Sequence, residues 1–152
     1  MDLPTVSEVG KTMQQRAQEI HRYDYRSEYL SPALRPEVIK ALWHALEVNS
    51  RSGWDGYGAA PASAGSHRTA CKFIQRLPLE VPDPEVGMDP DGEFSLEWFG
   101  AARDHVLSIS FGADDRLSFA FRNGVERRRG TTILREQLPS ELLAYLKSFD
   151  NR

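Results

Sequence analysis

Cysteine is nearly absent from this chain of 152 residues, in which Cys71 is the only thiol. A lone cysteine forms no internal disulfide, so the fold depends on its own core, and Cys71 is expected to be a small buried apolar side chain. Long apolar runs are missing too, since no stretch approaches the roughly 18 residues that a membrane span needs. The opening residues lack a basic start followed by an apolar run and so show no secretory signal. These absences predict a cytoplasmic protein that does not contact a membrane.

Catalytic and metal-binding motifs are scarce as well. The histidines are His21, His44, His67 and His105, and no two of them have the spacing of a zinc-ligand pair. No G-x-S-x-G turn presents a serine nucleophile. We therefore expect no metal ion, no cofactor and no residue with an assigned catalytic role.

Apolar and charged residues occur in ordinary proportions, 40% and 27% of the chain, so one folded domain is the default expectation. The charge is unevenly distributed, although its net value is only -3. Residues 80–115 contain ten acids and one base, whereas residues 116–152 contain eight bases and four acids. This asymmetry can steer a charged partner, but adjacent antiparallel strands can also neutralise each other across a sheet. We favour the second interpretation.

Two helices are expected in the first half of the chain. Pro36 and Glu37 suit the first turn of a helix that stops near Asn49, because proline is preorganised there and a carboxylate favours the positive end of the helix dipole. Ser63 fits the N-cap of a second helix that ends at Pro78. The apolar face of the second helix consists of Ala70, Phe73, Ile74 and Leu77.

Residues 1–35 are predicted to form an N-terminal arm or a weak helix, separate from a single domain of residues 36–152. Tyr25 and Tyr29 lie in a tyrosine-rich stretch of this arm. Tyrosine combines a large apolar ring with a polar tip, which suits partly wet contact surfaces. A tail that docks on its own domain would use the same residues, so both interpretations stay open.

Beyond Pro84 the apolar residues recur at every second position, which is typical of strands. The expected strands are residues 85–88, 93–99, 105–111 and 116–121, with a fifth after the turn at Asn123 and Gly124. A final helix begins at Pro139. The predicted fold class is α+β, with two N-terminal helices, an antiparallel meander of four to five strands, and a C-terminal helix packed on one face of the sheet.

The alternation assigns the side chains of the meander to two faces. An inner, apolar face consists of Phe94, Leu96, Trp98, Leu107, Ile109, Phe111, Leu117, Phe119 and Phe121. An outer, small and polar face consists of Ser95, Glu97, Val106, Ser108, Ser110, Ser118, Ala120 and Arg122. The inner face is expected to pack under the helices. The outer face is expected to lie in water, as antiparallel sheets allow, with a protein partner as the alternative occupant.

A glycine-rich loop with the sequence GWDGYG lacks the lysine and the spacing of phosphate-binding loops. Its glycines are expected to permit a tight connection, with Trp54 and Tyr57 holding the loop onto the sheet and Asp55 binding local amides. These three residues are also candidates for protein contact. A separate hypothesis places an unfamiliar enzyme site at this loop together with His67.

The run from Trp54 to Ser63, WDGYGAAPAS, resembles a W-D-G-Y-G-A-x-P motif in a group of small bacterial proteins of uncharacterised function, some of them carried on mobile elements. The later meander and the LPSELL run from Leu138 to Leu143 are similar to the same group, so the resemblance covers approximately residues 36–149. It implies a bacterial or phage setting and no catalytic residue.

A run of three arginines, Arg127, Arg128 and Arg129, could hold phosphates together with Arg122. Nucleic-acid binding is therefore a further hypothesis, although the acidic balance of the chain and the lack of a recognition motif count against it. The favoured hypothesis is a non-enzymatic module that binds another protein, such as an antitoxin, immunity factor or phage-encoded inhibitor, and homo-oligomerisation stays open. Its candidate contact residues are Trp54, Asp55, Tyr57, Tyr25, Tyr29, Arg122, Arg127, Arg128 and Arg129.

Overall fold

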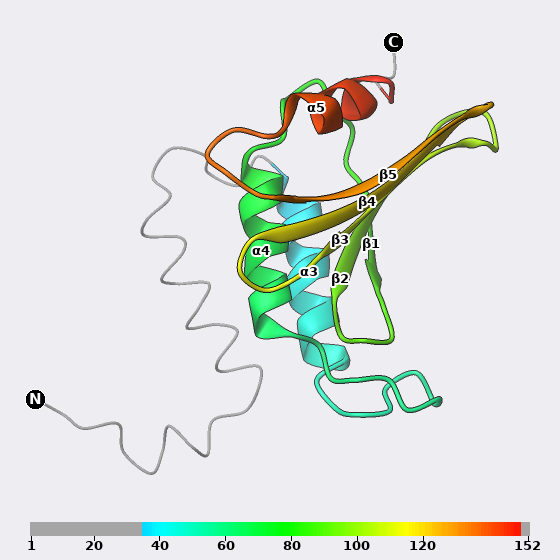
Figure 1. Ribbon diagram of the computed structural model, residues 1–152. Helices are drawn as coiled ribbons and strands as arrows, with labels where there is room; N and C mark the ends of the chain where they lie inside the picture. The colour runs from blue at the N-terminus through cyan, green and yellow to red at the C-terminus, as the bar shows by residue number, and fades with distance from the viewer. Residues whose placement is uncertain (1–34, 150–152) are drawn as a thin grey trace, which may run out of the picture.

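The computed structural model of this chain describes residues 35–149. In chain order these residues form α3 (Pro36–Val48), α4 (Ala64–Gln75), β1 (Glu85–Met88), β2 (Phe94–Phe99), β3 (His105–Phe111), β4 (Arg116–Asn123), β5 (Glu126–Ile133) and α5 (Ser140–Lys147) (Figure 1). The predicted α+β class with an antiparallel sheet is confirmed. The predicted arm, with Tyr25 and Tyr29, lies outside the described residues except for Arg35.

The five strands form one antiparallel sheet in the order β1-β2-β3-β4-β5, so each strand pairs with its neighbour in the sequence. Two of the turns have a glycine in the left-handed backbone conformation, with positive φ, which residues with a side chain rarely adopt. Gly92, at φ 87°, closes the β1–β2 turn by donating its N–H to the carbonyl of Asp89 at 2.9 Å. Gly124 serves the β4–β5 turn at φ 62°. The fifth strand expected after Asn123 and Gly124 is therefore present as β5.

The predicted alternation holds through β2, β3 and β4. All of the residues assigned to the inner face are buried, and they share one hydrophobic core with residues of α3, α4 and α5. On the outer face Ser95 is an exception, with an exposed fraction of only 3%. Beside Ser95, the carboxylate of Asp89 reaches across β2 to accept a hydrogen bond from Ser110, the cross-strand neighbour of Ser95.

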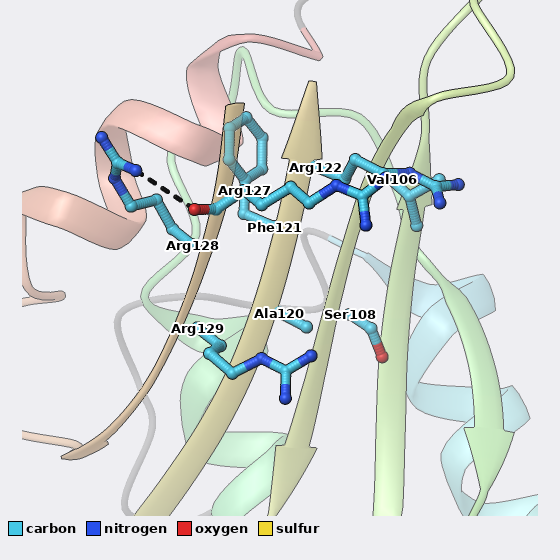
Figure 2. A pocket seen from close by; sticks show the side chains of 8 residues that line it. All are labelled: Val106, Ser108, Ala120, Phe121, Arg122, Arg127, Arg128 and Arg129. Atoms are coloured by element: carbon cyan, nitrogen blue, oxygen red, sulfur yellow. Dashed lines mark hydrogen bonds between the residues drawn. The ribbon is translucent and has the colours of Figure 1, made fainter. Parts of the chain in front are cut away.

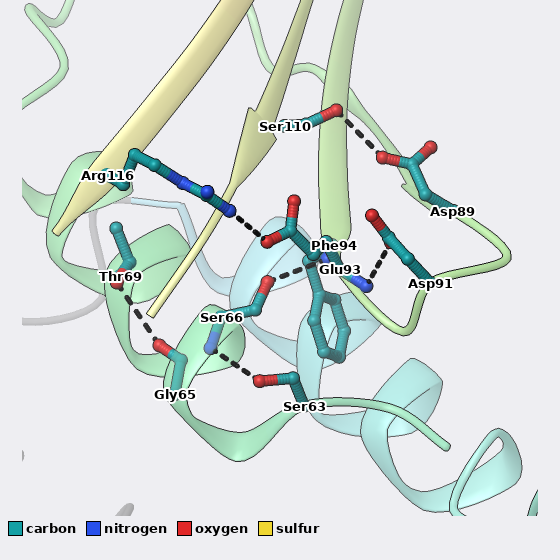
Figure 3. Close-up of polar contacts among 10 residues, drawn as sticks. All are labelled: Ser63, Gly65, Ser66, Thr69, Asp89, Asp91, Glu93, Phe94, Ser110 and Arg116. Atoms are coloured by element: carbon teal, nitrogen blue, oxygen red, sulfur yellow. Dashed lines mark hydrogen bonds and ion pairs between the residues drawn. The ribbon is translucent and has the colours of Figure 1, made fainter. Parts of the chain in front are cut away.

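Helix α4 is joined to the start of β2 by hydrogen bonds of two serines (Figure 3). Ser63 is the N-cap of α4, as expected, and its hydroxyl oxygen accepts a hydrogen bond from the N–H of Ser66 at 3.1 Å. The hydroxyl oxygen of Ser66 accepts in turn from the buried N–H of Phe94 at 2.7 Å. Ser63 also donates its own N–H to the carbonyl of Gly92 at 2.9 Å. These contacts hold the first residues of β2 against the first turn of α4.

The C-terminal helix and Phe149, which follows it, make aromatic contacts at the end of the sheet nearest the β4–β5 turn. The helix begins at Ser140, one residue later than expected. The ring of Tyr145 stacks on Phe121 at a centroid distance of 4.2 Å, and Phe149 stacks on His105 at 4.0 Å. Aromatic pairs of this kind stabilise a fold by about 0.5–1.5 kcal/mol beyond the area that they bury.

Replacing Ser66 with alanine should lower the free energy of unfolding by about 1–3 kcal/mol, because the buried N–H of Phe94 then loses its acceptor. Urea denaturation followed by circular dichroism measures this change. Ser52→Ala is the control, since Ser52 is exposed in the loop after α3 and should alter the stability by less than about 0.5 kcal/mol. Equal effects at the two serines would contradict the structural role given to Ser66.

Tyr145 should make the fold less stable in alkali. Burial of the ring raises the pKa of Tyr145 to about 12, and the hydrogen bond that its hydroxyl donates to Glu141 at 2.6 Å acts in the same direction. In the unfolded chain the phenol titrates near its ordinary pKa of about 10. The stabilisation is therefore complete below about pH 10 and is lost as the pH rises toward about 12. Urea denaturation across this range should show a steeper decline for the wild type than for Tyr145→Phe, and identical slopes would contradict the prediction.

Candidate functional site

A shallow groove of about 300 Å³ lies on the outer face of the sheet, at the end nearest the β4–β5 turn (Figure 2). Ser108 and Ala120 supply small side chains at its floor, while Arg122, Arg127 and Arg129 extend over it from β4 and β5. We call this feature the basic groove. A second shallow depression, of about 480 Å³, adjoins it and shares Ser108, Ala120 and Arg129.

Strand alternation divides the arginine run that the sequence presents as one patch. Arg127 and Arg129 lie on the outer face with Arg122. Arg128 pairs with Phe121 of the inner face, and its side chain extends toward α5 (Figure 2). Successive residues of a strand face opposite sides of the sheet. Arg128 is among the residues that line the groove, but its side chain extends away from those of Arg122, Arg127 and Arg129, contrary to the sequence prediction of a single patch.

The three arginines of the basic groove are not neutralised by the part of the chain that the structure describes. Arg122 and Arg127 lie directly opposite each other on β4 and β5, an arrangement in which like charges destabilise a sheet. Among residues 35–149, neither of them nor Arg129 forms an ion pair. Positive charge held in this way over small side chains attracts an anionic group.

Acidic side chains occupy the other side of the same face. Glu85 of β1 lies directly opposite Glu97 of β2, and the same row of the sheet continues through Ser108 and Ala120 to Arg129. The outer face thus changes from negative at β1 to positive at β5. The interpretation that neighbouring strands neutralise each other is wrong for this row, because β3 separates the acidic strands from the basic ones.

Charge is compensated at the corner beside the β1–β2 turn (Figure 3). Arg116 donates a hydrogen bond to Glu93 at 2.6 Å, and the hydroxyl of Ser110 donates to Asp89 at 2.8 Å. Partial burial and the neighbouring Asp91 raise the pKa of Glu93, whereas Arg116 acts in the opposite direction. At the other end of the sheet, in the basic groove, no acidic side chain of the described residues forms an ion pair with the arginines.

Sequence reasoning missed Phe99, whose side chain is 53% exposed on the outer face. Phe99 lies in one cross-strand row with Val106, Arg122 and Arg127. The sequence could have placed Phe99 on the outer face, because it lies two residues after Glu97 and residues two apart in a strand share a face. Exposed aromatic and arginine side chains are enriched together in protein contact surfaces.

The glycine-rich loop is held in shape by its own hydrogen bonds. Asp55 accepts from the N–H groups of Tyr57 at 2.8 Å and Ala59 at 3.1 Å, as expected for local amide binding. The indole N–H of Trp54 donates to the carbonyl of Ala60 at 2.7 Å. Tyr57 is 93% exposed, so the expectation that it holds the loop onto the sheet is wrong. The loop instead presents the Tyr57 ring to solvent.

The candidate contact residues of the described chain fall into two separate groups. The glycine-rich loop lies beside the β1–β2 turn, where the N–H of Ala60 donates to the carbonyl of Pro90 at 2.8 Å. Arg122 and Arg127 flank the β4–β5 turn. Successive turns of a meander alternate between the two ends of a sheet, so these two turns lie at opposite ends. The structure does not bring Trp54, Asp55 and Tyr57 together with the basic groove.

His67 is buried in the core, with an exposed fraction of 1%. Its ring makes edge contacts with Trp43 at a centroid distance of 4.3 Å and with Phe94 at 5.3 Å. Because Tyr57 projects into solvent, the enzyme site hypothesised at the loop together with His67 is not assembled. Among residues 35–149, no three side chains of histidine, cysteine, aspartate or glutamate gather where they could hold a metal ion.

Comparisons with protein-family models, curated proteins and solved structures found no match to this chain. The resemblance of the WDGYGAAPAS run to small bacterial proteins therefore stays a prediction. Within the described range, no helix has both the length and the apolar character that crossing a membrane requires.

Trp54 and Tyr57 should respond differently to alanine substitution. Trp54→Ala removes a half-buried ring and its hydrogen bond to Ala60, so the free energy of unfolding should fall by about 1–3 kcal/mol. Tyr57→Ala should change it by less than about 0.5 kcal/mol, because the side chain is exposed. Urea denaturation of both variants beside the wild type measures the difference, and equal losses would be incompatible with the loop geometry.

Proposed function

We propose that this protein is a non-enzymatic binding module that holds another protein on the outer face of its sheet. The observation that carries the proposal is the basic groove, where Arg122, Arg127 and Arg129 lie over Ser108 and Ala120 and form no ion pair with any other residue of the described chain. Arginine binds carboxylates through two parallel hydrogen bonds, which adds geometric specificity to the attraction of charge. The groove therefore suits an acidic segment of a partner protein.

A protein suits this face better than a nucleic acid does. A nucleic-acid-binding surface carries positive charge along the path of the phosphate backbone. Here Glu85 and Glu97 lie in the same row as Arg129 and would repel phosphates. The side chain of Arg128 faces the other side of the sheet, which reduces the basic area further.

In this proposal the two faces of the sheet have different roles: the inner face packs against the helices and the outer face binds the partner. We infer that α3, α4 and α5 pack on the inner face, which is supported by the shared core and by the stacking of Tyr145 on Phe121. A sheet supported in this way is a preorganised platform, so little conformational entropy is lost when a partner binds. Tyr57, on its hydrogen-bonded loop at the far end, is a second contact element.

The biological setting of the proposal comes from the loop motif. Its resemblance to small bacterial proteins, some of them carried on mobile elements, supports action in a bacterial cytoplasm as an antitoxin, immunity factor or phage-encoded inhibitor. Proteins of these classes act by covering a surface of their target, which requires a stable contact face rather than a catalytic centre.

Charge reversal in the basic groove should abolish partner capture. The variant carries Arg127→Glu and Arg129→Glu, and its control carries Arg68→Glu and Arg135→Glu, which make the same total charge change at exposed positions that do not line the groove. In affinity capture from a bacterial lysate, the wild type and the control should retain the same protein. The groove variant should retain it at least about tenfold less, because reversing a charge at an interface replaces attraction by repulsion.

Equal capture by the groove variant and the wild type would overturn the proposal. Retention of DNA or RNA that falls steeply with salt, and that the groove variant loses, would instead assign the groove to nucleic-acid binding. Circular dichroism and thermal denaturation of each variant confirm that a lost partner does not reflect a lost fold.

A further inference from the structure

The outer face is complementary in charge to a rotated copy of itself. We propose that a second copy of this chain docks on it face to face and forms a symmetric dimer. This inference rests on the proposed function, since it names a protein that the outer face receives. Because β3 is the middle strand, a two-fold axis parallel to β3 places the acidic strands β1 and β2 of one copy over the basic strands β5 and β4 of the other.

The strand register defines which charges meet in this arrangement. Glu85, Glu97, Ser108, Ala120 and Arg129 form one row from β1 to β5. The rotation reverses the row in the second copy, so Glu85 meets the second copy's Arg129. Ser108 meets Ser108 of the second copy at the axis. Symmetry repeats the contact between Glu85 and Arg129, as an interface built from one patch on both subunits requires.

A neighbouring row adds an aromatic contact to the same dimer. Phe99, Val106, Arg122 and Arg127 follow one another from β2 to β5. The rotation places the half-exposed ring of Phe99 over the second copy's Arg122, where an arginine over an aromatic face is attracted by the ring electrons. The dimer would thereby give a contact partner to the exposed ring of Phe99 and to Arg122, which forms no ion pair within the described chain.

The centre of the face permits two sheets to approach closely. Its side chains are small, namely Ser108, Ser110, Ser118 and Ala120. Sheets that pack face to face lie about 10 Å apart, with their strands aligned to within about 30°. Small residues at the centre and long charged residues at both lateral edges suit this spacing, because the long side chains reach across it.

The available area predicts a weak dimer. Five strands spaced about 4.8 Å apart, each contributing about six residues, cover about 500 Å² per copy. The total of about 1,000 Å² is at the lower limit of specific protein interfaces. We therefore expect a reversible dimer that forms at micromolar or higher concentration and that exposes the basic groove again when it dissociates.

Sedimentation velocity of the full chain over a concentration series tests the dimer. The wild type should show a monomer–dimer equilibrium that weakens with ionic strength. Arg129→Glu and Glu85→Arg should each raise the dissociation constant by at least about tenfold, because each turns two attractive contacts into repulsive ones. An equimolar mixture of the two variants should associate almost as well as the wild type, since every contact again joins opposite charges.

Matched controls make the result specific to this geometry. Arg135→Glu makes the same charge change in the exposed segment after β5, and Glu80→Arg makes the opposite change in the turn before β1, so both should leave association unchanged. A wild type that stays monomeric up to about 1 mM, or a variant mixture that does not associate, overturns the proposal. The proposal is also overturned if the control variants weaken association as much as Arg129→Glu and Glu85→Arg do.

Failure of the dimer and failure of the proposed function give different results. A monomeric wild type that still captures another protein through Arg127 and Arg129 removes the dimer and keeps the binding function. A dimer that behaves as expected, with no other protein lost on groove reversal, leaves the second copy as the partner that the outer face receives.

Discussion

Burial of the inner face of the meander determines which side chains lie on its outer face. Along β3, Leu107, Ile109 and Phe111 enter the core while Ser108 and its outer neighbours do not. A register shift of one residue would exchange the two sets and bury polar groups in the core. The free-energy cost of burying them would increase with each strand that shifts. The contacts of Ser66 at the start of β2 oppose the same shift, because they bind a specific backbone N–H. The arrangement of side chains on the outer face is thus imposed by the core beneath it.

The meander converts the order of charges along the chain into an order across the sheet. In a sheet of strand order β1-β2-β3-β4-β5, neighbours in sequence are neighbours in space. Acids concentrated in the first strands and bases in the last ones must then lie at opposite lateral edges, with β3 between them. A crossover connection would have interleaved the two and neutralised them. The polarity of the outer face follows from this simple topology, as does the lack of an ion pair at Arg122 and Arg127 within residues 35–149.

Features decided by a few adjacent residues were predictable. Ser63 caps α4, and Gly92 and Gly124 adopt positive φ in their turns, because capping and turn conformation depend on local backbone geometry. The candidate site was predicted less completely. Arg128 was grouped with its neighbours, since the face that each residue of β5 occupies becomes visible only when the pairing of β5 with β4 is known. Phe99 was omitted although its position in β2, two residues after Glu97, already placed it on the outer face.

The sequence by itself determined the alternation of apolar and polar side chains along the strands, the positions of the turns and the segregation of charge, because each of these depends on residues that are neighbours in the chain. Only the tertiary structure decided that His67 is enclosed by rings, that Tyr57 projects into solvent and that Asp89 reaches over β2 toward Ser110. The enclosure of a side chain depends on which distant segments pack around it. Which side chains are enclosed therefore depends on the assembled core and sheet, and it cannot be predicted from the periodicity of a single segment.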